Sequence, residues 1–321
     1  MGDLDTVRES VHVPVLLHEL IETFASEASP FWYLDGTLGG CGHASAIAEA
    51  YAKANSGSKP NIIGFDRDPQ AIERAKAVLA GKADKLILVN DSFRNLDIAL
   101  DSNGISAVDA ILFDLGLSSD ELENSGKGFS FQKDEPLLMT MGDPATYPFT
   151  ASTIVNSWKE EDIANVIFGY GEERYARRIA HGIVLYREKK AIETTHELAE
   201  IVKSSMPHFA FKGRPSKIHP ATKTFQALRI AVNDELGALK EGLAKGYARL
   251  APGGKMAVIS FHSLEDRIVK EFFKEQGEMS RKQAGTSPVL TKKPITASPQ
   301  EIAENPRSRS AKLRIIQKQK S

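Results

Sequence analysis

A glycine-rich turn followed by three apolar runs constrains this chain more than any other part of its sequence. The turn reads Asp-Gly-Thr-Leu-Gly-Gly-Cys-Gly-His over residues 35–43, between an apolar run at 31–34 and a helical pattern at 44–53. The three later apolar runs end at or near acids, which are Asp66, Asp91 and Asp114. Because ligands of open α/β sheets bind beyond the carboxyl ends of the strands, this order predicts an α/β fold with a nucleoside cofactor along one edge of a doubly wound parallel sheet.

The polar residues at the predicted strand ends differ in the part of the ligand they suit. Asp66 lies 24 residues after Gly42, the separation at which an acid on the second strand reaches a ribose diol. Phe93 is expected to pack against a purine, and Asp91 to accept a hydrogen bond from the purine amine. Asp114 ends the fourth run and is expected to face the reaction centre.

The glycine spacing separates the possible cofactors. Glycines at a strand-to-helix turn also occur in flavin and nicotinamide enzymes and in purely structural turns. The four glycines here do not follow the G-x-G-x-x-G spacing of dinucleotide sites; they are Gly36, Gly39, Gly40 and Gly42. Asp35 opens the loop and would repel a phosphate. We therefore expect S-adenosylmethionine, which has no pyrophosphate, with Asp35 holding its ammonium group indirectly.

Length and composition exclude several classes of protein. A chain of 321 residues can bury a full α/β core and a second unit of about 80 residues. There is neither a basic start with a long apolar run nor an apolar stretch near about 18 residues, so we expect a soluble, uncleaved, cytoplasmic protein. Cys41 is the only cysteine, which excludes an intrachain disulfide, and no Cys/His cluster has zinc spacing, so no metal site is expected. We interpret Cys41 as a small residue in a tight loop rather than a nucleophile.

Positive charge is concentrated in two regions of a nearly neutral chain. Residues 281–321 carry 10 Lys and Arg against 2 Asp and Glu, which leaves the first 280 residues at −9 of a total of −1. The stretch 201–232 contains six cations and no acid: Lys203, Lys212, Arg214, Lys217, Lys223 and Arg229. Two basic regions on an acidic body indicate either oriented contact with phosphates or a solvated tail and an ordinary helix face.

The spacing of the strand candidates predicts an inserted domain. About 140 residues separate Asp114 from the fifth candidate strand, Lys255–Phe261, far more than a crossover needs. We expect a methyltransferase core at 1–135 and 216–321 and an inserted helical, substrate-selecting domain at 136–215. The insert's expected helices are Thr150–Phe168, Glu172–Lys189 and Thr195–Ser205. After the fifth strand we expect a helix at 264–276, a loop at 277–310, and Lys312–Gln317 as an antiparallel edge strand.

One helix is predicted to start at Pro220 and continue to Leu243. Its apolar row is expected to face the core and consists of Phe225, Leu228, Val232, Leu236, Leu239 and Leu243. The opposite row, Thr222, Gln226, Arg229 and Asn233, either lines a substrate channel, with Arg229 on a phosphate and Gln226 or Asn233 on a base edge, or faces solvent. His262, just past the fifth strand, either points toward the cleft or belongs to a helix cap.

Eight segments in order from residue 12 to residue 314 resemble the bacterial 16S ribosomal RNA cytosine-N4 methyltransferases. They are 12–16, 35–43, 65–69, 114–119, 128–131, 219–236, 260–267 and 305–314, and the 18-residue segment 219–236 is too long for a chance match. The resemblance implies a class I S-adenosylmethionine-dependent methyltransferase, Rossmann-like with an inserted helical domain. It also implies a decoding-region (P-site) cytidine of 16S rRNA, within the 30S subunit, as acceptor, with no membrane or DNA partner.

By that resemblance the cofactor contacts fall on one set of residues: Cys41, Gly42, His43, Asp66, Phe93, Asp114 and Glu121. The family has glutamine where this chain has Glu121, and a carboxylate lacks the amide donor of that contact. The family's Pro-Leu-Asp-Met-Arg-Met-Asp also differs here, where Leu138 and Thr140 replace the acid and the arginine. We expect any role of that loop in RNA binding to be weaker in this chain.

The acceptor chemistry gives Asp114 its expected role. An exocyclic cytosine amine shares its lone pair with the ring, so acceptors must hold its protons before nitrogen can attack a methyl group in line. Asp114 is the candidate acceptor, and Phe129, Phe131 or Phe261 the candidate for stacking on the extruded base. Two other functions remain open: a methyltransferase acting on a small-molecule or protein amine, and a protein that binds the cofactor without turnover.

Overall fold

The computed structural model describes residues 14–25, 31–117, 122, 125–207, 219–284 and 287–320. The chain divides into two compact units, one made of residues 1–119 and 238–321 and the other of residues 120–237. These boundaries differ from the expected ones at 136 and 215, because the helix that follows residue 221 packs against helices of the second unit.

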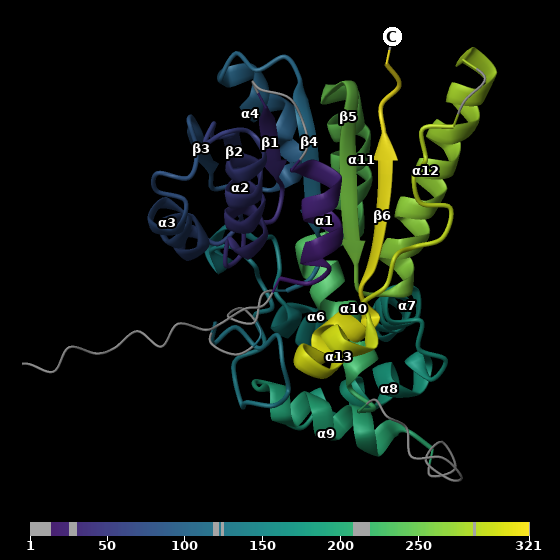
Figure 1. Ribbon diagram of the computed structural model, residues 1–321. Helices are drawn as coiled ribbons and strands as arrows, with labels where there is room; N and C mark the ends of the chain where they lie inside the picture. Colours follow the sequence, from purple (N-terminus) through teal and green to yellow (C-terminus); the bar gives the residue numbers. More distant parts are fainter. Residues whose placement is uncertain are drawn as a thin grey trace, which may run out of the picture. The chain divides into compact units, whose positions relative to one another are not determined.

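A six-stranded sheet forms the centre of the first unit (Figure 1). Its order is β3-β2-β1-β4-β5-β6, where the first five strands are parallel and β6 is antiparallel to β5. The bounds are β1 Trp32–Asp35, β2 Asn61–Phe65, β3 Leu86–Val89, β4 Val108–Asp114, β5 Leu250–Ser260 and β6 Lys312–Gln317. The chain order reverses between β1 and β4, which is the switch point where ligands of such sheets bind. The predicted doubly wound α/β core and its antiparallel edge strand are thus confirmed.

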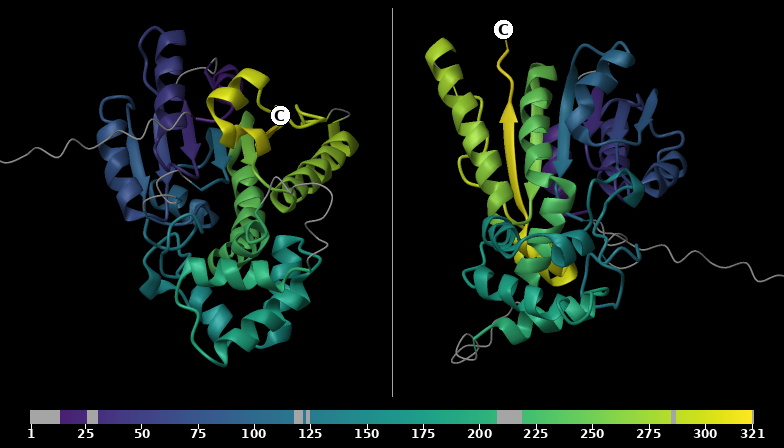
Figure 2. Two further views of the ribbon diagram at one scale, coloured as in Figure 1. Left: turned by 90° about the horizontal axis from the view of Figure 1, so that it is seen from below. Right: turned by 180° about the vertical axis from the view of Figure 1, so that it is seen from behind.

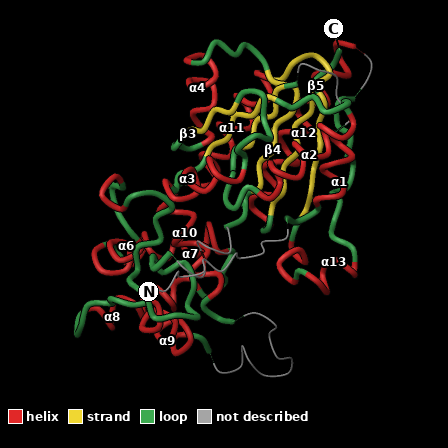
Figure 3. The backbone as a smooth tube through the Cα atoms, turned by 60° about the vertical axis from the view of Figure 1, so that its left-hand side comes forward, coloured by secondary structure: helices red, strands yellow, loops and turns green. Residues whose placement is uncertain are grey.

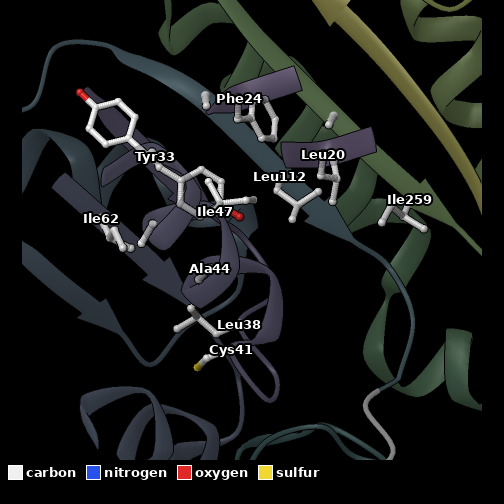
Figure 4. Packing of buried hydrophobic residues seen from close by; sticks show 14 of the residues in the cluster. Leu20, Phe24, Tyr33, Leu38, Cys41, Ala44, Ile47, Ile62, Leu112 and Ile259 are labelled. Atoms are coloured by element: carbon white, nitrogen blue, oxygen red, sulfur yellow. The ribbon is translucent and has the colours of Figure 1, made fainter. Parts of the chain in front are cut away.

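Helices cover both faces of this sheet, which appears as a yellow layer flanked by red helices in Figure 3. The helices are α1 Leu17–Phe24, α2 Gly42–Ala54, α3 Pro69–Val78, α4 Leu96–Ser102, α11 Glu235–Arg249, α12 Ser263–Ala284 and α13 Pro299–Glu304. Successive strand residues point to opposite faces. Tyr33 and Leu112 pack in the core formed with α1, α2 and α3, shown in Figure 4, whereas Leu34 and Phe113 pack in the core formed with α4, α11 and α12.

The second unit is helical in the residues that the structure describes, as predicted (Figure 2). Its helices are α6 Ala151–Ser157, α7 Glu160–Gly171, α8 Ala176–Arg187, α9 Thr195–Ser205 and α10 Thr222–Asn233, with α7 packed on both α8 and α10. The threonines Thr150 and Thr194 begin α6 and α9 with capping boxes, in which side chain and backbone bond reciprocally.

Two helices predicted as continuous are broken, so those predictions were wrong. The helix expected at 150–168 is interrupted at Trp158, whose backbone is extended, and α7 restarts with three acids that suit a helix N-terminus. The helix expected from Pro220 to Leu243 ends at Asp234, which adopts the left-handed conformation (φ 47°), and α11 begins at the next residue.

The segment after β5 is more regular than expected. The helix α12 continues to Ala284, and the predicted loop 277–310 instead contains α13, a 3₁₀ turn at Pro306–Ser310 and two bridges to β6. These bridges join Val289 to Ile316 and Ile295 to Leu313. In the described part of the chain, we find no helix with the length and hydropathy required to cross a membrane.

Candidate functional site

The carboxyl ends of β1, β2 and β4 come together around the glycine loop, residues 36–42. Gly36 donates its backbone N–H to the Leu112 carbonyl at 2.9 Å, and Leu38 donates to the Phe65 carbonyl at 3.0 Å. The loop therefore connects β1 to both neighbouring strands. Asp35, Asp66 and Asp114 consequently lie along one rim of the sheet, as the sequence predicted.

The loop is held in a strained shape. Gly39 has a φ of 47° and Cys41 a φ of 62°, and the Cys41 N–H bonds to the Leu38 carbonyl at 2.6 Å. The Leu38 side chain packs so closely on Gly64 that a Cβ there would lie 2.6 Å from it. Cys41 is 1% exposed and lies in the core (Figure 4), and burial above all raises the pKa of its thiol to about 12. This supports our interpretation of Cys41 as a packing residue, so that its contact with a cofactor would have to use its backbone.

Asp35 is an internal brace rather than a surface acid. It is 1% exposed, accepts a hydrogen bond from the Tyr33 hydroxyl at 2.9 Å and accepts another from the Thr37 N–H at 3.0 Å. The Thr37 hydroxyl in turn accepts the backbone N–H of Asp114 at 2.7 Å. Tyr33 and Thr37 were missed in the sequence, although Tyr33 lies two residues from Asp35 and hence on the same strand face.

Burial of Asp35 makes the stability of the chain depend on pH. Desolvation is the main cause that raises its pKa from 3.8 to about 6, so between about pH 4 and pH 6 the native state holds a proton that the unfolded chain has released. The free energy of unfolding therefore falls as pH rises through that window, by up to about 3 kcal/mol. Urea unfolding measures the free energy of unfolding of the wild-type chain and of Asp35→Asn. We expect the difference, wild type minus variant, to be larger at pH 4.5 than at pH 7.5. An equal difference at both pH values would contradict this, and Asp101→Asn, which changes an exposed acid of α4, serves as control.

Asp66 fastens the loop and still faces the rim. One oxygen accepts the Gly39 N–H and the other the Asp68 N–H, each at 2.8 Å. Burial is the largest cause raising the pKa of its carboxyl group. Each oxygen retains a second lone pair, so the carboxylate can also accept hydrogen bonds from ribose hydroxyls.

Phe93 begins a 3₁₀ turn, Phe93–Asn95, after β3, and Asp91 lies two residues before it. The Phe93 ring stacks on Phe113 with centroids 4.6 Å apart. Phe93 is partly exposed, and only the exposed part of its ring could contact an adenine. Asp91 accepts the Ser92 N–H at 2.6 Å and the Asn95 amide at 3.0 Å, so its carboxylate shapes the turn. Its expected bond to a purine amine stays a prediction.

His43, in the first turn of α2, and Asp114, at the end of β4, lie close together. The Nδ1 atom of His43 is 3.5 Å from Oδ2 of Asp114, and its Nε2 atom is 2.9 Å from the Val15 carbonyl oxygen. The imidazole is thus engaged on both sides by protein groups. Val15 was not predicted as part of the site, and its backbone contact leaves no signal in the sequence.

The polar row of α10 neither lines a described channel nor faces solvent. Arg229 forms a two-pronged ion pair with Glu235, with Nε–Oε1 and Nη2–Oε2 distances of 2.8 Å. Gln226 donates to the Tyr170 carbonyl at 3.0 Å, near the end of α7. These bonds hold the second unit together, so their expected contacts with a substrate remain predictions.

Asn233 is the most buried member of that row, 2% exposed. Its amide donates to the Met139 carbonyl at 2.7 Å, and its oxygen accepts the Met141 N–H at 3.0 Å. It thereby fixes the loop that contains the departures Leu138 and Thr140 from the resembled pattern.

His262 takes part in the cap of α12, the second of the two interpretations. Its Nδ1 accepts the Glu265 N–H at 3.4 Å, and the Glu265 carboxylate accepts the backbone N–H groups of Phe261 at 2.9 Å and His262 at 3.3 Å. Glu121, the remaining expected cofactor contact, lies outside the described residues.

The donor set of the rim fits S-adenosylmethionine. Asp66 and Asp35 accept backbone N–H groups of the loop, Asp114 donates its own N–H to the hydroxyl of Thr37, and Asp91 follows β3. Such a set favours a ligand with ribose hydroxyls and positive sulfonium and ammonium groups, and it disfavours the phosphates of a dinucleotide.

This chain is similar to known methyltransferases over nearly its whole length. Proteins named Ribosomal RNA small subunit methyltransferase H are 46% identical in Geotalea uraniireducens, over 96% of this chain and 98% of that protein, and 45% identical in Deinococcus deserti, over 98% and 96%. A solved putative rRNA-methylase from Clostridium thermocellum has a TM-score of 0.42 at 14% identity, covering 96% of this chain and 100% of that chain. A putative methyltransferase from Streptococcus mutans in complex with SAH has a TM-score of 0.40 at 12% identity, covering 94% of both chains. A family model described as the MraW methylase family matches residues 9–319, and with relatives this similar over nearly the whole length the chain belongs to that family.

Proposed function

We propose that this chain transfers the methyl group of S-adenosylmethionine to the exocyclic N4 of a decoding-region cytidine of 16S rRNA, acting in the cytoplasm on the 30S subunit. Methyl transfer to small-subunit ribosomal RNA is the activity named for its relatives. The observation that carries the finer proposal is the position of Asp114, a carboxylate at the end of β4 on the same rim as the ribose-binding candidate Asp66.

In this proposal, residues of the chain position the cytosine amine and supply a negative charge beside it. S-adenosylmethionine, when bound, supplies an electrophilic methyl group on a sulfonium. Asp114 holds an N4 proton of the cytosine, which turns the nitrogen lone pair toward that methyl group. Its backbone is fixed through Thr37 and Asp35, so the carboxylate does not have to be ordered at each turnover.

Phe261 is the aromatic residue best placed beside Asp114. A Cβ added to Gly116 would lie 2.8 Å from the Phe261 ring, so this ring covers the backbone two residues after Asp114. Phe131, in contrast, is already stacked on His219 at 4.5 Å and packed edge-on against Phe225 at 5.2 Å. We therefore assign stacking on the extruded cytosine to Phe261.

Replacing Asp66 by alanine is expected to weaken cofactor binding about 10- to 100-fold, because a charged acceptor for the ribose and the clamp on Gly39 are lost together. Calorimetric titration with S-adenosylmethionine measures the dissociation constant. Asp84→Ala, an exposed acid on the turn before β3, is the control and should bind as the wild-type chain does. Unchanged affinity in Asp66→Ala would remove the ribose assignment.

The proposed function is tested with the full chain and 30S subunits from cells that lack the gene. After incubation with S-adenosylmethionine, nuclease digestion and mass spectrometry should show N4-methylcytidine in the 16S RNA. Methylation of a different nucleoside, or methylation only of small amines or protein, would overturn the proposal. Protein-free 16S RNA offered in parallel shows whether the assembled subunit is the substrate.

A further inference from the structure

Both ring nitrogens of His43 have defined partners within the first unit. The Val15 carbonyl, 2.9 Å from Nε2, can only accept a hydrogen bond, so Nε2 carries the hydrogen. In the neutral imidazole Nδ1 is then the atom with the free lone pair, and it faces Oδ2 of Asp114 at 3.5 Å. Hydrogen bonds between catalytic groups that are long without substrate often shorten once substrate is bound.

The carbonyl that orients His43 is itself held in place. The next residue, Leu16, is fully buried and adopts a left-handed backbone (φ 54°, ψ 35°), which is costly for a residue with a side chain of this size. Its N–H donates to Oε1 of Glu301 at 2.7 Å, a contact from α13 that spans 285 positions of the sequence. The Val15–Leu16 segment is thus fixed by His43 on one side and by Glu301 on the other.

We propose that His43 and Asp114 form a proton-accepting pair, in which His43 takes up, through Asp114, the proton released from the methylated amine; this inference rests on the proposed function. As the N4–methyl bond forms, the methyl–sulfur bond breaks and sulfur keeps the electron pair, which leaves one proton too many on nitrogen. That proton passes to the Asp114 carboxylate and from there to Nδ1 of His43, and it returns to solvent after the product leaves.

Exposure and charge agree with this order of transfer. The Asp114 side chain is 18% exposed and that of His43 9%, so Asp114 meets the acceptor and His43 lies behind it. The other titratable groups around the pair are Tyr33, Asp35 and Cys41. Burial raises the pKa of the Tyr33 hydroxyl and the Cys41 thiol, so both stay neutral, whereas the Asp35 carboxyl group, whose pKa burial raises to about 6, is negative above that pH.

The test compares pH profiles of methylation of 30S subunits by the full-length wild-type chain, His43→Gln and Glu301→Ala. Glutamine can still donate to the Val15 carbonyl but cannot take a proton. We expect His43→Gln to lower kcat about 10- to 100-fold and to move the acid limb of the profile to lower pH, where a carboxylate alone titrates. Glu301→Ala loosens Leu16 but keeps the imidazole, so it should lower kcat less and leave the limb in place.

In the pH profiles, two results would overturn the inference: a His43→Gln profile that superimposes on that of the wild-type chain, or an equal shift of the limb in both variants. A measurement on the wild-type chain covers the case in which His43→Gln does not fold. Nitrogen NMR of histidine-labelled protein reports which ring nitrogen carries the hydrogen, and the His43 signal is assigned by its loss in His43→Asn. We expect neutral His43 to carry its hydrogen on Nε2 and none on Nδ1. The opposite tautomer would exclude the pair. If the wild-type chain forms no N4-methylcytidine, the proposed function is wrong. The tautomer of His43 then still tests the His43–Asp114 pair independently.

Discussion

The Asp114→Asn variant is expected to lose methyl transfer to 30S subunits by about 10²- to 10⁴-fold. Asparagine keeps the shape of the side chain and the backbone bond to Thr37, but it removes the negative charge that holds the amine proton and the group that first accepts it. Single-turnover transfer of a labelled methyl group measures the chemical step directly. The loss should appear in kcat, because the acceptor acts in the transition state.

Asp101→Asn is the matched control for this experiment. Asp101 belongs to the same unit, is exposed and pairs only at the surface with Arg249, so its loss should leave the rate unchanged. If Asp114→Asn instead raises KM for S-adenosylmethionine and leaves kcat intact, Asp114 binds the cofactor and takes no part in the chemistry.

Replacing Arg229 by alanine is expected to destabilise the second unit by about 3 kcal/mol. The Arg229 and Glu235 side chains are only 16% and 10% exposed, and removing one partner leaves a buried charge without its counterion. The two tryptophans lie in different units, Trp32 in the first and Trp158 in the second. Urea unfolding followed by fluorescence in a Trp32→Phe background therefore reports the second unit alone.

The same variant decides between structural and substrate roles for Arg229. Lys203→Ala is the control, since Lys203 pairs with Glu200 at the surface of α9, with side chains 55% and 70% exposed, and should change stability by less than about 0.5 kcal/mol. Unchanged unfolding of Arg229→Ala, combined with weaker RNA binding and a smaller salt slope, would contradict the ion-pair role and place Arg229 on a phosphate.

The sheet and the acids along its rim could be predicted from the sequence, because short local segments determine them. Short apolar runs that end in acids describe buried parallel strands, and the glycine loop requires backbone conformations that its sequence permits. Parallel strands place their carboxyl ends on one edge, so it was predictable that Asp66 and Asp114 would lie beside the glycine loop, although their individual partners Gly39 and Thr37 were not.

The polar row of α10 was not predictable, because helical spacing shows which residues share a face and not what covers that face. The partners of Gln226 and Asn233 are backbone groups of Tyr170, Met139 and Met141, which any residue would offer. The apolar pattern also gives no sign of the break at Asp234, because the helical spacing of the apolar residues is the same before and after it. Contacts with distant parts of the chain determine these hydrogen bonds and this helix end, and the periodicity of the sequence contains no information about such contacts.

The two ends of the sheet also bear on how this chain behaves in concentrated solution. Open strand edges invite pairing with other molecules, and here β3, at one end, is only four residues long, whereas the outer side of β6, at the other, is bridged by Val289 and Ile295. A chain cut short before β6 would bare the long backbone of β5 and is expected to aggregate, so the C-terminal strand protects this edge of the sheet from pairing with other molecules.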